Sequence, residues 1–290
     1  MGGRCVKVRI ISGVTFALLM MLVVWLGDAV LAVAWCAVSV IAYIEMANAT
    51  NVSVIDAQGK RKLNLIETIS IVGIVIYYAV VYLMQEPLYE MLTIIFLLIL
   101  TMVVYVFSFP KYKAEQIMHS LFAFIYGPVM ISFSLMTRMM NNGMDTSLYN
   151  VGFFAAWMIF ISAWASDTCA YFVGVAFGRH KLAPTLSPKK SIEGAVGGVL
   201  GATIAGGLYG KILESCGVFG DGRIWIFALL GMCGSIVAQI GDLAASAIKR
   251  NFDIKDYGKC IPGHGGVLDR FDSVIFTSPL IYVLALYFLG

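Results

Sequence analysis

Apolar residues in this chain gather into nine long runs that are separated by short polar connections. Each run approaches the roughly 20 residues that a membrane-spanning helix needs. Within hydrocarbon, backbone amides must find their hydrogen-bond partners inside a helix. The pattern therefore predicts an all-α, polytopic integral membrane protein with about nine transmembrane helices, near residues 10–26, 28–44, 66–84, 91–109, 118–137, 148–166, 194–213, 223–245 and 273–289.

Composition agrees with this pattern and excludes a soluble protein. Hydrophobic residues make up 60% of the 290 residues and charged residues only 13%, and the mean hydropathy is +0.87. Soluble domains carry about 45–50% apolar and about 25% charged residues. A compact soluble core could not bury this much apolar surface.

The basic residues predict the orientation of the bundle, because cytoplasmic loops of membrane proteins carry an excess of Lys and Arg. With the N-terminus in the cytoplasm and the C-terminus outside, only three of the 20 basic residues fall on the outer side, namely Arg138, Lys211 and Arg223. We therefore expect a multi-pass protein of the inner (plasma) membrane with its active site facing the cytoplasm. The net charge of +3 does not favour nucleic acid as a partner, and basic residues at the surface suit membrane lipids.

The first apolar run also has an alternative interpretation as a signal peptide. Arg4, Lys7 and Arg9 precede it, and Ala32-Val33-Ala34 resembles a cleavage site. The spanning length of the run, and the second apolar segment that follows almost at once, favour a retained helix.

The two halves of the chain differ in polarity. Residues 1–150 predict an N-terminal scaffold of about five transmembrane helices, in which Glu45 is interpreted as an interfacial residue. Residues 151–290 predict a catalytic region with two polar cytoplasmic loops, near 167–193 and 246–272. Ionisable residues at membrane depth are costly, so they indicate function by default.

The segment 246–272 is the richest in candidate chemistry, with five cations, four carboxylates and a Pro-Gly-His-Gly-Gly turn in 27 residues. On a helix, the spacing of Asp242, Ser246, Lys249 and Arg250 places them on one face. A carboxylate with two cations about two turns further along suits a metal-bound polyphosphate.

Asp269 and Asp272 are three residues apart and would be neighbours on a helix. They could share Mg²⁺, which takes oxygen ligands and keeps water positions for phosphate oxygens. The alternative is that they cap the helix and complement its dipole.

The turn itself has two interpretations. Gly263, Gly265 and Gly266 could present backbone amides to phosphate oxygens, or could form a plain tight turn. His264 is alone in its neighbourhood, which does not favour zinc. It could donate a hydrogen bond to phosphate or have a structural role.

The earlier polar segment combines one carboxylate with two lysines. Asp167 begins a helically spaced face of small residues. Lys189 and Lys190 lie beside Ser187 and could hold a triphosphate or a lipid phosphate. The alternative for the lysines is a charge pair that only sets topology. The glycines from Gly194 to Gly210 are interpreted as helix packing.

Together these residues resemble the signature of the CDP-diacylglycerol synthase (phosphatidate cytidylyltransferase) family. The run 246–272 matches it at every fixed position, in the form S-x-x-K-R-x4-K-D-x-G-x3-P-G-H-G-G-x-x-D-R-x-D. The upstream segments 167–174 and 187–194 are similar to the family as well, so the resemblance covers roughly residues 160–290. It implies a polytopic enzyme of phospholipid biosynthesis that requires Mg²⁺ and joins CTP to phosphatidic acid.

The resemblance and the positions of the residues together give expected roles, with the choice of metal-ligating carboxylates resting on position. The expected catalytic residues are Asp242, Asp269, Lys249, Arg250 and Arg270. The expected metal ligands are Asp242, Asp269 and Asp272. The expected substrate-binding residues are Ser187, Lys189, Lys190, Ser246, Lys255, Asp256, Lys259, Gly263, His264, Gly265, Gly266 and Asp167.

Two other classes of function stay open at this point. A CTP-dependent lipid kinase of the polyprenol or dolichol type would share the membrane helices and Mg²⁺, but would transfer the γ-phosphate. A secondary transporter would favour ionisable residues near the bilayer midplane and two repeated halves, whereas here these residues gather at helix ends in one half. A homodimer is a possible assembly.

Overall fold

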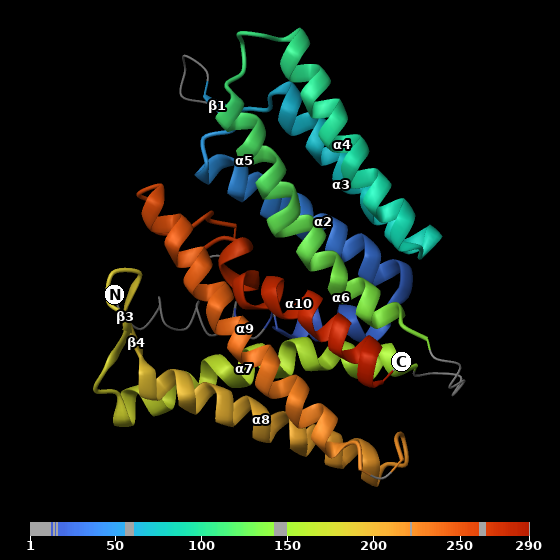
Figure 1. Cartoon of the computed structure of the whole chain (residues 1–290), viewed down its shortest axis with the longest axis vertical. Helices are drawn as coiled ribbons and strands as arrows, with labels where there is room; N and C mark the ends of the chain where they lie inside the picture. The colour runs from blue at the N-terminus through green and yellow to red at the C-terminus, as the bar shows by residue number, and fades with distance from the viewer. Residues whose placement is uncertain are drawn as a thin grey trace. The chain divides into compact units, whose positions relative to one another are not determined.

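The computed structural model describes residues 13, 15, 17–55, 61–141, 150–220, 222–260 and 265–289. Within these residues, eight helices are long and apolar enough to cross a membrane, and Ala17–Leu26 forms a shorter apolar helix (Figure 1). The long helices are α2 (Asp28–Ala49), α3 (Leu65–Met84), α4 (Pro87–Phe107), the continuous segment of α5 (Ala114–Phe124), η1 (Ile125–Val129) and α6 (Met130–Met139), α7 (Val151–Phe177), α8 (Ile192–Ser215), α9 (Ile224–Asn251) and α10 (Leu268–Phe288).

The predicted all-α, polytopic class is confirmed. Each predicted span from the second to the ninth corresponds to one of the long helices. The first predicted span corresponds in part to Ala17–Leu26. The basic residues that precede it, and Lys60 in a later connection, lie outside the described residues.

The chain forms two compact units. Unit 1 consists of Met1–Met136 and Phe252–Arg270, and unit 2 of Thr137–Asn251 and Phe271–Gly290. The segment that carries much of the polar motif thus belongs to the same compact unit as the N-terminal helices. The functional division near residue 150 stays a prediction, because the units describe packing.

Buried hydroxyl pairs join the helices of unit 1. Tyr43 on α2 pairs with Ser120 on α5 at 2.7 Å, and Ser39 pairs with Tyr78 on α3 at 2.7 Å. Such pairing removes the cost of leaving a polar group unsatisfied away from water. The short antiparallel strands β1 (Val54–Ile55) and β2 (Arg61–Lys62) precede α3.

Helices α7, α8 and α9 of unit 2 pack side by side (Figure 1). Small residues at every fourth position of α8 are buried in this packing, namely Gly194, Gly198, Ala202, Gly206 and Gly210. A Cβ on Gly206 would overlap the backbone carbonyl of Phe227 on α9. The interpretation of these glycines as helix packing is confirmed, since only small residues allow such an approach.

The polar connections are shorter than the sequence predicts, because the helices continue into them. Helices α7 and α9 have 27 and 28 residues, which gives each a length of about 40 Å, whereas the hydrocarbon core is about 30 Å thick. Upright helices of this length would extend past the hydrocarbon, and the C-terminal parts of both carry polar side chains. What remains is a connection at 252–267 and one at 178–191, which contains the antiparallel strands β3 (Lys181–Ala183) and β4 (Ser187–Ser191).

Candidate active site

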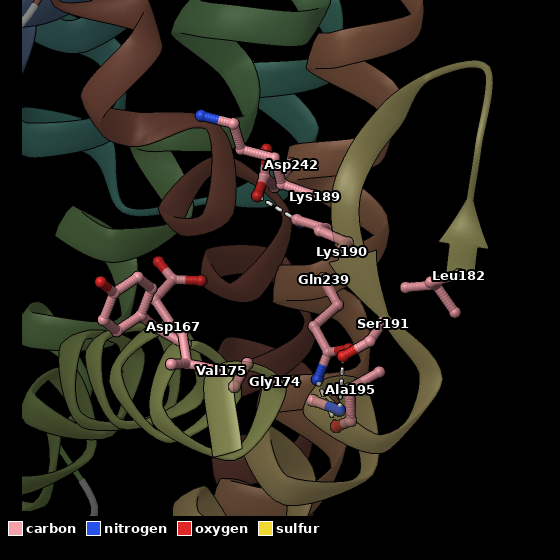
Figure 2. A pocket seen from close by; sticks show the side chains of 13 residues that line it. Asp167, Gly174, Val175, Leu182, Lys189, Lys190, Ser191, Ala195, Gln239 and Asp242 are labelled. Carbon is pink, nitrogen blue, oxygen red and sulfur yellow. Dashed lines mark hydrogen bonds and ion pairs between the residues drawn. The ribbon is translucent and has the colours of Figure 1, made fainter. Parts of the chain in front are cut away.

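A cleft of about 420 Å³ lies in unit 2, between α7, α8, α9 and the β3–β4 hairpin (Figure 2). Its polar lining comes from Asp167, Lys189, Lys190, Ser191, Gln239 and Asp242. Its apolar lining includes Tyr171, Val175 and Leu182. The cleft therefore combines charge of both signs with an apolar wall, which suits an amphiphilic phosphate.

Lys190 and Asp242 form an ion pair across this cleft, as Figure 2 shows. Their side chains are 28% and 27% exposed, so both charges are partly shielded from water. A carboxylate placed within an apolar helix is costly unless it is paired. The ammonium group offsets that cost, and phosphate oxygens would compete for the same ammonium group.

The hairpin holds Lys190 over the cleft through contacts at its base. The Ser191 hydroxyl oxygen caps α8 by accepting a hydrogen bond from the Gly194 amide at 3.1 Å. The Glu193 carboxylate accepts from the amides of Arg179 and His180, at 3.1 and 3.2 Å, and pairs with His180 Nδ1 at 2.6 Å. Ser191 and Glu193, two residues of the family motif, thus fix the backbone that carries Lys189 and Lys190.

A network of polar side chains includes Gln239, which lines the cleft. Gln239 Nε2 on α9 donates to the Ala195 carbonyl on α8 at 3.0 Å and to Ser166 Oγ on α7 at 3.3 Å. Ser235 Oγ donates to Ser166 Oγ at 2.8 Å. The network joins three helices beneath the charged groups. Sequence reasoning missed it, although a Gln within an apolar helix was a signal that could have found it.

Carboxylates from three helices gather near the cleft. Asp272 on α10 lies within electrostatic range of Asp242, Asp167 and Lys249, and its Oδ1 accepts from the Ser273 amide at 2.8 Å. No group of three His, Cys, Asp or Glu side chains in the described part of the chain forms a ready metal cage. Magnesium is usually held by one or two carboxylates together with substrate phosphates, so this donor set fits Mg²⁺ bound along with a polyphosphate.

The motif carboxylate Asp269 lies in unit 1 and bonds to backbone. Its Oδ2 accepts hydrogen bonds from the amides of Tyr257 at 2.9 Å and Gly266 at 3.0 Å. The side chain is 6% exposed. Asp269 thereby joins both sides of the connection that leads from α9 to α10, and its predicted metal role stays a prediction.

Glu45 on α2 was missed by sequence reasoning, which interpreted it as interfacial. It is only 4% exposed. Its Oε1 accepts from the Val267 amide at 3.0 Å and its Oε2 from the Leu268 amide at 2.8 Å. The signal that could have found it is an acidic residue near the end of an apolar helix.

These contacts bear on the phosphate-binding interpretation of the glycine turn. The amides of Gly266, Val267 and Leu268 already donate to carboxylates of the protein itself. Gly265 adopts a φ of 84°, which a side chain would disfavour. Gly263 and His264 lie outside the described residues.

The remaining predicted residues divide between the two units. Four of the predicted site residues lie in unit 1 with exposed side chains, namely Lys255, Asp256, Lys259 and Arg270. In unit 2, Ser187 begins β4, Ser246 and Lys249 are partly buried on α9, and Arg250 is exposed near the end of that helix.

Residues 7–288 match the cytidylyltransferase family. The chain belongs to this family. It is 43% identical over 125 residues to a phosphatidate cytidylyltransferase of Staphylococcus haemolyticus, covering 43% of this chain and 46% of that protein. Proteins of the same name match from Brucella suis, at 42% over 137 residues (47% and 48% coverage), and from Bacillus subtilis, at 40% over 125 residues (43% and 45%). The chain spans about half the length of the curated relatives it matches, and the family resemblance of the motif is confirmed.

Proposed function

We propose that the protein is a phosphatidate cytidylyltransferase, which joins CTP to phosphatidic acid and produces CDP-diacylglycerol and pyrophosphate. The observation that carries this proposal is the Lys190–Asp242 ion pair in a cleft with an apolar wall, in a polytopic member of the cytidylyltransferase family. The names of its relatives support these two substrates.

The reaction is an attack by a phosphatidate oxygen on the α-phosphorus of CTP. A new P–O bond forms, the bond from the α-phosphorus to the oxygen bridging to the β-phosphate breaks, and its electron pair leaves with pyrophosphate. A phosphomonoester has a second pKa near about 6, so the nucleophile is largely ionised at neutral pH and needs no general base. The main obstacle is the repulsion between two anions.

Basic residues of the cleft reduce this repulsion. Lys190 and Lys189, both on β4, neutralise phosphate charge where the hairpin meets the helices. Asp242 and Asp272, both in unit 2, would hold Mg²⁺. When bound, this ion would offset the charge of the triphosphate and orient it.

The proposed setting is the cytoplasmic face of the inner (plasma) membrane. Asp167 and Asp242 lie in the C-terminal halves of α7 and α9, two helices longer than the hydrocarbon is thick, which supports a position near the membrane surface. CTP would arrive from the cytoplasm, and the lipid would already lie in the membrane. Homodimer formation stays a prediction.

The test uses detergent-purified protein, phosphatidic acid and CTP labelled at the α-phosphate, with Mg²⁺ or with EDTA. We expect label in a chloroform-soluble product only with Mg²⁺, together with release of pyrophosphate. If folded protein puts no α-label into lipid, the proposal is wrong. Transfer of a γ-label to lipid, with release of CDP, would identify the kinase alternative.

A further inference from the structure

The start of α10 presents a problem common to all helices, because the first amides have no partner within the helix. In this protein the amides of Val267 and Leu268 donate to the two oxygens of Glu45. Glu45 is separated in sequence by 222 positions from Val267 and by 223 positions from Leu268. A carboxylate from another helix therefore caps α10.

Burial raises the free-energy cost of losing this contact for both partners. Glu45 is 4% exposed and lies within the apolar span of α2. A buried carboxylate without partners is costly, as is a buried amide without an acceptor. Charge-assisted hydrogen bonds, and the positive end of the helix dipole, satisfy both requirements together.

Two motif glycines make room for the Glu45 carboxylate. A Cβ on Gly258 would overlap Glu45 Oε1. A Cβ on Gly266 would lie closer than van der Waals contact to both Glu45 oxygens. These glycines therefore permit a close approach between the connection at 252–267 and α2. The Glu45 carboxylate and the two glycines therefore pack directly against one another.

We infer that Glu45 is a positioning residue, which holds the described parts of the connection (252–260 and 265–267) and the first turn of α10 in the arrangement needed for nucleotidyl transfer. The connection carries Lys255, Asp256 and Lys259, which we expect to bind substrate, and the first turn carries Arg270, which we expect to be catalytic. This inference rests on the proposed function for its kinetic consequence, but its structural part can be tested without turnover.

The first variant is Glu45→Gln, which keeps the size of the side chain but turns an NH₂ group toward an amide donor. We expect kcat for CDP-diacylglycerol formation to fall about 100-fold, since small misplacements of catalytic groups have effects of that order. The KM values for CTP and phosphatidic acid should change far less, because the charges that attract phosphate are retained. Glu90→Gln is the matched control, since Glu90 is 8% exposed on α4 of the same unit.

The second measurement follows the thiol of Cys260, an exposed residue of the same connection. Partial burial, the negative charge of Glu45 and a hydrogen bond to Glu45 raise the pKa of this thiol. In Glu45→Gln, iodoacetamide should alkylate Cys260 at least several-fold faster, while the exposed Cys216 of unit 2 serves as the internal reference. Mass spectrometry of the peptides quantifies both sites.

A glycine variant covers the case in which Glu45→Gln does not fold. Gly258→Ala should push a methyl group against the carboxylate and reproduce both effects, whereas Gly220→Ala, with no atom within 4 Å of the added methyl group, should not. Unchanged Cys260 reactivity in the folded variants, or a kcat equal to that of Glu90→Gln, would overturn the inference. Wild-type protein without cytidylyl transfer would instead overturn the proposed function, and the alkylation result would still decide the role of Glu45.

Discussion

In unit 2 the Asp242 carboxylate pairs with the ammonium group of Lys190 at a cleft, whereas in unit 1 Glu45 and Asp269 accept hydrogen bonds from backbone amides. A lysine side chain can move to a new partner at little cost, because its stem is flexible. A backbone amide can leave its acceptor only if the local fold opens. The same residue type is thus available to a ligand in one region and committed to the fold in the other.

Exposure supports this contrast. Asp242 and Lys190 are more than a quarter exposed, but Glu45 and Asp269 are 4% and 6% exposed. Variants in the cleft should therefore change catalysis while stability stays nearly constant. Variants at the backbone-bonded carboxylates should change stability and catalysis together.

Asp242→Asn should have the largest effect. We expect kcat to fall by about 10³-fold or more, because the variant removes a charged oxygen that we propose as a ligand for Mg²⁺ while it keeps side-chain size. The melting temperature should change by no more than a few degrees. Transfer of α-label to lipid and thermal unfolding in detergent measure the two quantities. A large loss of stability would show that Asp242 belongs with the structural carboxylates.

Lys190→Met should reduce kcat/KM by about 10²-fold, the size of effect seen when one charge-stabilising donor is removed. Lys190→Arg should recover part of the activity, since it restores the positive charge. Lys62→Met, on the exposed strand β2 of unit 1, is the control and should retain activity. Equal losses in both methionine variants would mean that only general surface charge matters.

Asp269→Ala should destabilise the protein by about 2–3 kcal/mol, because the buried amides of Tyr257 and Gly266 lose their acceptor. Asp269→Asn keeps a carbonyl oxygen and should retain most of this stability. Denaturation of both variants in detergent gives the comparison. Equal stability of the alanine variant and the wild type would contradict the structural role.

Ser191→Ala should have the smallest effect. Loss of the N-cap bond to the Gly194 amide should lower stability by about 1 kcal/mol. The lysines on β4 should keep most of their effect on catalysis, because Glu193 still accepts hydrogen bonds from the amides of Arg179 and His180, directly before β3. Thermal unfolding and the KM for CTP check the two parts.

Sequence patterns predicted much of the fold and part of the candidate site. Eight of the nine predicted spans correspond to long helices. Asp167, Lys189, Lys190 and Asp242 were predicted as site residues and line one cleft. The site assignments themselves stay predictions, and the sequence did not foresee the β3–β4 hairpin, because its strands are only three and five residues long.

The sequence by itself determined the class of the protein, since the length of an apolar run and the need to bond every amide within hydrocarbon are local properties. It also singled out Asp167 and Asp242, which lie in the C-terminal halves of α7 and α9. Only the tertiary structure decided their partners: Lys190 for Asp242, and two amides more than 220 residues away for Glu45. Hydropathy and periodicity report on one helix at a time, whereas the partner of a buried charge depends on how helices pack.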